Sequence, residues 1–252
     1  MQGQEVKPQK AVLISIQPKW CEKIAAGKKT VEVRKTMPKL ETPFKCYIYC
    51  TNKKPFLVWG DVFRGNWETE ITTVHGYSRK DADAKWGIFN GRILGEFVCD
   101  NIFEIVEDFN IHHELPGSPV EKWLTWDDAP DEYDSSEDIE KATCLSMDEI
   151  SAYMGTSGGC FCWHISDLVI YDDPKPLSEF YKCGAVPMDD LEEELCCHCA
   201  ETDYGEKKEC HTPSGVWMCE GRWCAEAYQA YLDEEFALTR PPQSWCYVEA
   251  KR

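Results

Sequence analysis

Residues 30–34 alternate polar and apolar side chains, which is typical of a strand with one buried face. The polar positions are Thr30, Glu32 and Arg34. An arginine fork matches phosphate or a carboxylate, and a carboxylate can accept a hydrogen bond from the amino group of a nucleobase. Lys29 could contact phosphate as a point charge, or act as a base if it is desolvated. The alternative is an internal Glu32–Arg34 network that only rigidifies the fold.

Aromatic residues close to lysines are the second candidate for chemistry. Lys19 and Trp20 are adjacent, and an aromatic-rich strand is expected to end at Thr51. Stacking surface beside positive charge is the usual arrangement for a single strand or a flipped base. Trp163 and His164 could add another wall and a titratable group. Each of these aromatic residues could instead be structural, with the tryptophans in the core.

A cysteine-rich segment supplies the candidate metal site. Cys196 and Cys199 form one pair, and Cys219 and Cys224 form a second. Four thiolates bind Zn²⁺ tetrahedrally and leave no open position, so the predicted zinc is structural and contributes folding energy. The alternative is a cluster of free thiols. The competing ligands are Cys197, His198, Cys210 and His211.

The charge distribution is uneven along the chain. The net charge is −18, yet residues 1–54 contain 12 Lys and Arg against 4 Asp and Glu. A local basic face can bind phosphate, while the acidic remainder disfavours indiscriminate nucleic-acid binding. The acidic excess also fits a protein-interaction module that occupies the nucleic-acid site of a host protein.

The cysteine count and the length of the apolar runs indicate the cellular compartment. The 15 cysteines are an odd number, which in a reducing compartment indicates thiols and metal ligation. No apolar run approaches the roughly 20 residues that span a bilayer, and the N-terminus lacks the apolar core of a signal peptide. We therefore expect a cytoplasmic protein without a membrane partner.

Short elements must position these residues. Pro18 can open a helix that Gly27 ends, and Lys28 then leads into the polar strand. Ser146 with Glu149 fits a capping box. Many short strands with few helices indicate a small, partly open barrel. The other strands are expected within 11–16, 44–51, 92–106, 160–171 and 240–249.

The segment Gly27–Arg34 resembles the G-x-K-T-x-E-x-R signature of ASCH domains, which belong to the PUA-like barrels. Leu94–Phe97 and Trp163–Ile165 agree with it, and 240–248 resembles the larger ASCH proteins of Firmicutes prophages. The resemblance implies an α+β fold, a PUA-like small β-barrel with flanking helices. The barrel would occupy 10–182, with 107–144 as an acidic loop, followed by a zinc-binding insertion over 183–237 and a closing strand over 238–252.

The resemblance also implies recognition of RNA or a modified nucleotide in a cleft beside the signature strand. One ASCH branch is similar to an amidohydrolase of N4-acetylcytidine that uses a lysine, a threonine and a glutamate. Its lysine corresponds to Lys29, but Glu32 stands where its threonine would be. A further branch is described as ribonucleolytic, so whether this chain is an enzyme stays open, with Lys29 and Glu32 as the catalytic candidates.

The functional hypotheses are therefore three: RNA or nucleotide binding, a hydrolase on the same cleft, and an acidic phage module that binds a host protein. A phage-encoded protein would work in the host cytoplasm. The expected ligand-binding residues are Lys19, Trp20, Lys28, Lys29, Thr30, Glu32, Arg34, Thr51, Trp163 and His164.

Overall fold

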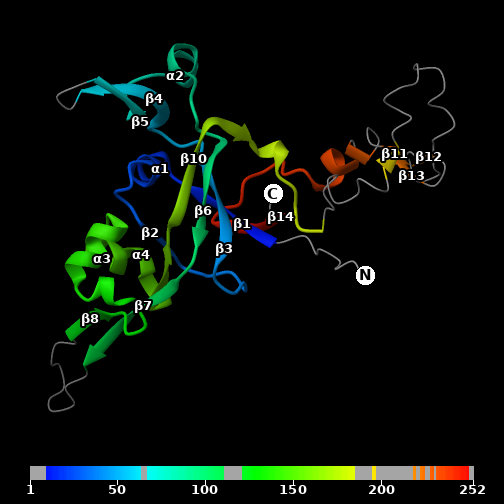
Figure 1. The fold of residues 1–252 in the computed structure, drawn as a ribbon. Helices are drawn as coiled ribbons and strands as arrows, with labels where there is room; N and C mark the ends of the chain where they lie inside the picture. The colour runs from blue at the N-terminus through cyan, green and yellow to red at the C-terminus, as the bar shows by residue number, and fades with distance from the viewer. Residues whose placement is uncertain are drawn as a thin grey trace.

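The computed structural model shows a mixed α+β fold (Figure 1). It describes residues 10–63, 67–110, 121–184, 195–196, 218–219, 222–224, 228–229 and 231–249. No helix in these ranges is long and apolar enough to cross a membrane.

A five-stranded sheet forms the centre of the molecule, in the order β10-β6-β3-β1-β14. β1 runs parallel to β3, and the other neighbours are antiparallel. The central strands are apolar and almost wholly buried, which is typical of strands covered on both faces. The strands are β1 (Lys10–Ile16), β3 (Phe44–Cys50), β6 (Arg92–Cys99), β10 (Ser166–Pro176) and β14 (Trp245–Glu249).

A four-stranded antiparallel sheet has the order β2-β9-β7-β8. β9 and β10 are separated only by Ile165, so the chain passes directly from one sheet to the other. Within the described ranges, the edge strands β10 and β14 of the five-stranded sheet do not pair, and the expected barrel is not closed. The strands are β2 (Val31–Arg34), β7 (Ile102–Asn110), β8 (Glu121–Thr125) and β9 (Gly159–His164).

Two smaller sheets complete the strand inventory. One is the hairpin of β4 (Phe56–Phe63) and β5 (Trp67–Val74), which lies with α2 (Arg79–Trp86) at the opposite end of the molecule from β8 (Figure 1). The other consists of β11 (Leu195–Cys196), β12 (Met218–Cys219) and β13 (Arg222–Cys224), with β13 in the middle.

The helices are short, and their ends follow the sequence signals. Pro18 is the first residue of α1, and Gly27, with a φ of 65°, lies just beyond its end. The capping box of Ser146 and Glu149 opens α4. The helices are α1 (Pro18–Ala25), α2 (Arg79–Trp86), α3 (Ser136–Thr143) and α4 (Met147–Met154), with shorter turns at η1 (Asp131–Tyr133), η2 (Gly155–Ser157), η3 (Leu177–Glu179) and η7 (Leu232–Phe236).

The segment 107–144 is not the acidic loop expected from the sequence. Its described part contains the end of β7, all of β8, η1 and α3. Ile139 and Ala142 lie three positions apart on one face of α3 and are buried. This narrow apolar face is enough to dock a two-turn helix whose remaining positions are mostly polar or charged.

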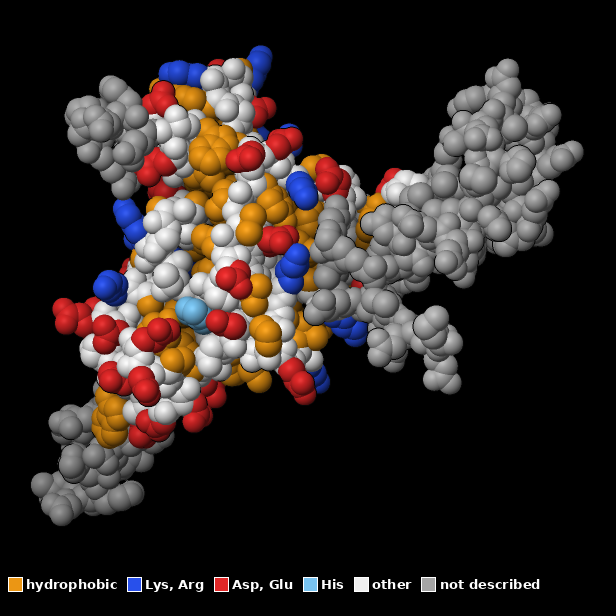
Figure 2. Space-filling view, in the orientation of Figure 1, with side chains coloured by type: hydrophobic (Ala, Val, Ile, Leu, Met, Phe, Trp, Pro, Cys, Tyr) orange, Lys and Arg blue, Asp and Glu red, His pale blue; other side chains and the backbone are white. Residues whose placement is uncertain are grey.

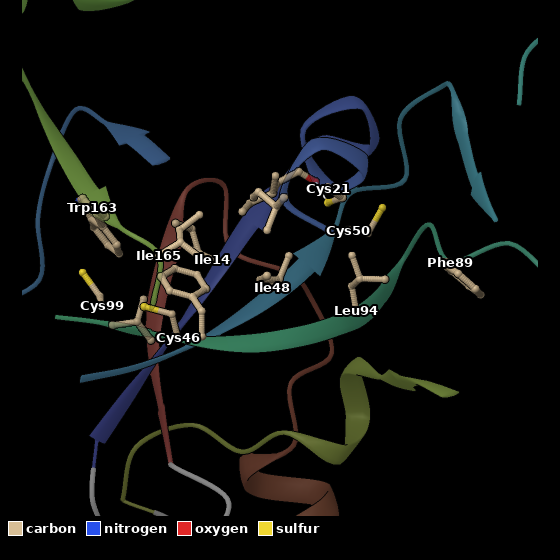
Figure 3. Close-up of a cluster of buried hydrophobic side chains, with 14 of the residues drawn as sticks. Ile14, Cys21, Cys46, Ile48, Cys50, Phe89, Leu94, Cys99, Trp163 and Ile165 are labelled. Carbon is tan, nitrogen blue, oxygen red and sulfur yellow. Dashed lines mark hydrogen bonds between the residues drawn. The ribbon is translucent and has the colours of Figure 1, made fainter. Parts of the chain in front are cut away.

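One apolar cluster forms the core of the five-stranded sheet, and a second packs against the signature strand. Ile14, Ile48 and Leu94 come from three neighbouring strands and gather in the core under α1 (Figure 3). Val31 and Val33 of β2 pack in a second cluster with residues of α3 and α4. The valines of β2 therefore face one core, as expected, and the side chains of Glu32 and Arg34 emerge on the other face.

Candidate functional site

A cleft of about 730 Å³ lies over the signature strand. Its floor is formed by Lys29 and by Glu32 and Arg34 of β2. Residues of α1, the end of β3 and α4 line it, together with the segment 241–244 that leads into β14. This volume falls within the roughly 300–1,000 Å³ of small-molecule and cofactor pockets.

Three charged side chains form one network on the cleft floor. Glu32 Oε1 is 3.0 Å from Arg34 Nη2, and Glu32 Oε2 is 3.4 Å from Lys29 Nζ. The side chains of Lys29, Glu32 and Arg34 are only 2%, 8% and 9% exposed. Two cations around one carboxylate leave the network with one net positive charge.

Main-chain carbonyls hold both cations in place. Lys29 Nζ donates to the carbonyl oxygen of Thr143 at 2.7 Å, and Arg34 Nη2 donates to that of Ser15 at 2.7 Å. Arg34 Nη1 also lies 3.4 Å from Ser244 Oγ. Such charge-assisted hydrogen bonds offset the desolvation of buried charges. The geometry of the floor is therefore fixed by α3, β1 and the segment before β14.

Two aromatic side chains line the cleft beside cations. The ring of Trp20 has the ammonium groups of Lys19, Lys23 and Lys29 at 4.2, 5.4 and 5.3 Å from its centroid. Tyr153 of α4 is half-exposed, with Lys35 Nζ 5.4 Å from its ring centroid. Partial burial raises the pKa of Tyr153 above its usual range, so its hydroxyl stays protonated at neutral pH and can donate a hydrogen bond.

A second cleft of about 690 Å³ lies beside Lys28, Thr30 and His164. Thr30 precedes β2 and does not share the strip of Glu32 and Arg34, because its main chain bonds to α3 through Ala142 and to Ile165. The expected single polar strip is therefore divided between two clefts.

His164 in this second cleft is oriented by a carboxylate. Its Nδ1 atom is 2.6 Å from Asp100 Oδ1, and its Nε2 atom is 4.0 Å from Glu132 Oε1. Partial burial acts to raise the pKa of Asp100, but the hydrogen bond and attraction of His164 outweigh it and hold that pKa below its usual range. Burial, with Glu132 close to its hydroxyl, raises the pKa of Tyr133.

The family model of the ASCH domain matches residues 14–151, more than half of the chain. The chain belongs to the ASCH domain family. The matched range contains Lys29, Glu32 and Arg34, which form the floor of the first cleft.

Solved structures of ASCH proteins are similar to this chain at low sequence identity. The ASCH protein from Zymomonas mobilis has 12% identity and a TM-score of 0.36, with 90% of this chain and 95% of that chain covered. Two single-residue mutants of the ASCH protein from the same organism have 12% identity and TM-scores of 0.32 and 0.33. They cover 90% and 92% of this chain and 98% and 99% of their own. No curated protein matches the chain.

In this ASCH domain, the first cleft brings together most of the residues expected to bind ligand. Lys28, Thr30 and His164 line the second cleft instead. Trp163 lines neither cleft, because its side chain is 0% exposed and packs edge-on against Phe44 and beside Trp245. It is a core residue rather than a cleft wall. The expected residues that line the first cleft are Lys19, Trp20, Lys29, Glu32, Arg34 and Thr51.

The ASCH cleft also contains residues that the sequence reasoning missed. Tyr153 and Glu149 lie four positions apart on α4 and both line the cleft. The capping box had indicated this helix, and the spacing of four would have placed both residues on one face. Ser15 and Ser244 are brought in by the pairing of β1 with β14, for which the sequence carries no local signal.

The predicted zinc ligands are described only in part. The main chains of Cys196 and Cys224 are paired in register between β11 and β13, and Cys219 lies in β12 on the other side of β13. Cys224 is the last residue of β13. Among the side chains that the structure describes, no group of three or more His, Cys, Asp or Glu is arranged to hold a metal ion. The remaining candidates, Cys197, His198, Cys199, Cys210 and His211, lie outside the described residues.

Proposed function

We propose that this ASCH domain binds RNA or a modified nucleotide in the first cleft. The observation that carries the proposal is the buried Lys29–Glu32–Arg34 network on the cleft floor, with Trp20 and Tyr153 as aromatic walls. Aromatic faces beside cations are the arrangement on which unpaired bases stack while their phosphates are neutralised. The family supports this class of ligand, and the basic first part of the chain supplies four of the five residues.

Each group then has a separate role. The carboxylate of Glu32 accepts a hydrogen bond from an amino or ring N–H group of the base. Trp20 and Tyr153 stack on the base or on its neighbour. Lys19 is exposed at the cleft and contacts phosphate as a point charge.

A matched pair of lysine–tryptophan neighbours makes the test selective. Lys19 lies 4.2 Å from the Trp20 ring in the cleft, and Lys85 lies 4.3 Å from the Trp86 ring on α2, outside it. Fluorescence anisotropy with a panel of labelled single-stranded RNAs should give weaker binding for Lys19→Ala and Trp20→Ala than for the parent. Lys85→Ala and Trp86→Ala should bind like the parent. Equal binding by all four variants would show that the site is misplaced.

A hydrolase on the same cleft is the second candidate function. Three observations favour it: a lysine and a carboxylate are 3.4 Å apart, Thr51 lines the same cleft, and the buried hydroxyl of Thr51 has no hydrogen-bond partner among the described residues. Thr51 then takes the place of the hydroxyl nucleophile that Glu32 cannot provide. Product formation from N4-acetylcytidine and from single-stranded RNA should be measured for the parent, Lys29→Ala and Thr51→Val. Parent activity no higher than that of Lys29→Ala would exclude these substrates.

A further inference from the structure

A third pocket, of about 320 Å³, lies between β8 and α4 and shares no lining residue with either cleft. Met147, Asp148 and Ser151 come from α4, whose residues Glu149 and Tyr153 face the first cleft instead. The pocket is therefore on a different face of the same helix. Its lining residues are Glu107, Trp123, Leu124, Trp126, Ser136, Met147, Asp148 and Ser151.

The pocket walls are aromatic, and one of them is rigid. Trp123 is 40% exposed, so part of its ring is open to a ligand. The indole N–H of Trp126 donates to the carbonyl oxygen of Tyr133 at 2.7 Å, which fixes the orientation of that ring. The ring faces of Trp123 and Trp126 and the thioether of Met147 offer a surface on which a flat or extended side chain can lie.

Carboxylates stand at the same pocket. Asp148 is exposed, and Glu107 Oε1 accepts a hydrogen bond from Ser151 Oγ at 3.5 Å. The surroundings carry the same sign: residues 121–150 contain eleven Asp and Glu against two Lys. Figure 2 shows acidic side chains gathered over the part of the molecule formed by β7, β8, α3 and α4. A phosphate-bearing ligand is repelled here, and a cationic ligand is attracted.

A guanidinium group matches this combination of surfaces. Arginine stacks its planar group on tryptophan faces, donates to carboxylates as a fork, and lays its methylene stem on apolar atoms. The volume is at the low end for ligand pockets, which fits one long side chain better than a whole nucleotide.

We propose that the Trp123–Trp126–Asp148 pocket binds an arginine side chain from a basic segment of another protein. The acidic surface extends well beyond the pocket. A small amine would contact only the pocket, whereas a basic protein segment can also contact the surrounding acidic surface, so the partner is a protein segment. In addition, β8 pairs only with β7 within the described residues, so an extended segment can add to this edge of the sheet while its arginine enters the pocket.

Binding of a basic peptide tests the proposal directly. The probe is a fluorescein-labelled decapeptide of alternating Arg and Val, and the same peptide with Glu in place of Arg is its control. Trp123→Ala and Asp148→Lys alter the pocket at exposed positions, so both variants should fold, which circular dichroism checks. Asp173→Lys and Val169→Ala are matched controls, since both positions are exposed and lie outside the pocket.

The Arg–Val peptide should bind the parent, and both pocket variants should lose about tenfold or more in affinity while both controls stay close to the parent. An equal loss in Asp173→Lys would show that only net charge matters and would overturn the pocket. Unchanged binding by Trp123→Ala would do the same. Agmatine, a free guanidinium compound, should bind far more weakly than the peptide. If agmatine bound as tightly as the peptide, the proposal of a protein partner would be overturned.

Discussion

Lys29 and Thr143 are joined by a 2.7 Å hydrogen bond from the side-chain ammonium to the main-chain carbonyl, although 114 positions separate them in the chain. Thr143 ends α3, where helix carbonyls lack donors from the same helix and the helix dipole favours a cation. The N–H of Thr30 donates to Ala142 at the same helix end. The last turn of α3 therefore positions the signature segment as the floor of the first cleft.

Glu32 should be essential for stability, because it is the buried anion between two buried cations. We expect Glu32→Ala to lower the free energy of unfolding by about 3–5 kcal/mol, since Lys29 and Arg34 would lose their anionic partner without regaining water. Urea denaturation followed by tryptophan fluorescence measures the change.

Glu96 provides the matched control for Glu32. It pairs with Lys45 at 2.9 Å, but these side chains are 23% and 32% exposed, so solvent screens the pair. Glu96→Ala also removes the hydrogen bond that the Tyr171 hydroxyl donates at 2.6 Å. The loss in the free energy of unfolding for Glu96→Ala should nevertheless be clearly smaller than that for Glu32→Ala. Equal losses for the two variants would contradict the assignment of a buried network.

Gly95 should not tolerate a side chain, because β6 and β10 approach each other closely at this point. A Cβ atom there would collide with the carbonyl oxygen of Val169 and lie 3.0 Å from Ile170 Cα, both in the backbone of β10. We expect Gly95→Ala to lower the free energy of unfolding by about 3 kcal/mol.

Gly27→Ala is the control, since Gly27 has a φ of 65° and open space around its Cβ position. We expect Gly27→Ala to lower the free energy of unfolding by about 1–2 kcal/mol, because alanine is strained at a positive φ. Denaturation of the two variants side by side tests the difference, and a Gly95→Ala protein as stable as the parent would refute the close approach.

Local elements of the site could be predicted from the sequence, but their long-range partners could not. Pro18, Gly27 and the capping box of Ser146 act through neighbouring residues, so the limits of α1 and the start of α4 follow from them. The alternation of β2 likewise separates its valines from its charged side chains. α3 was missed because only one narrow apolar face distinguishes it from an acidic loop.

The contacts that complete the cleft depend on the tertiary fold. Ser15 and Ser244 meet Arg34 only because β14 pairs with β1, and Thr143 meets Lys29 only because α3 docks on β2. Thr30 was assigned to the strip by strand alternation, but the strand begins one residue later and its main chain bonds to α3. The charged residues of the floor could therefore be named from residue types, but the division of the expected polar strip between two clefts could not be predicted.

The Asp100–His164 pair should make a small, pH-dependent contribution to stability. Because the pKa of Asp100 is lowered in the folded protein, its contribution is present above the ordinary carboxyl pKa and is lost as the pH falls through the folded-state value. The Asp100 side chain is 43% exposed, so Asp100→Asn should lower the free energy of unfolding at pH 7 by less than about 1 kcal/mol.

The test is denaturation of the parent and Asp100→Asn at a series of pH values. The two stabilities should converge as the pH falls through the lowered folded-state pKa of Asp100, because the carboxyl group then becomes protonated in both states. Asp173→Asn, at an exposed position, is the control and should show little difference at any pH. A difference for Asp100→Asn that does not shrink as the pH is lowered from 7 would exclude an ionic origin.

We propose that the cysteine-rich segment holds one structural zinc ion. The main chains of Cys196, Cys219 and Cys224 lie in one three-stranded sheet, which brings two distant parts of the sequence together. Metal analysis of the full chain should give about one zinc per molecule. Cys219→Ser should lower this content, while Cys144→Ser, outside the segment, should not. Chelation should unfold the segment, detected as new proteolytic cleavage within 183–237. A metal-free protein that resists cleavage there would refute the proposal.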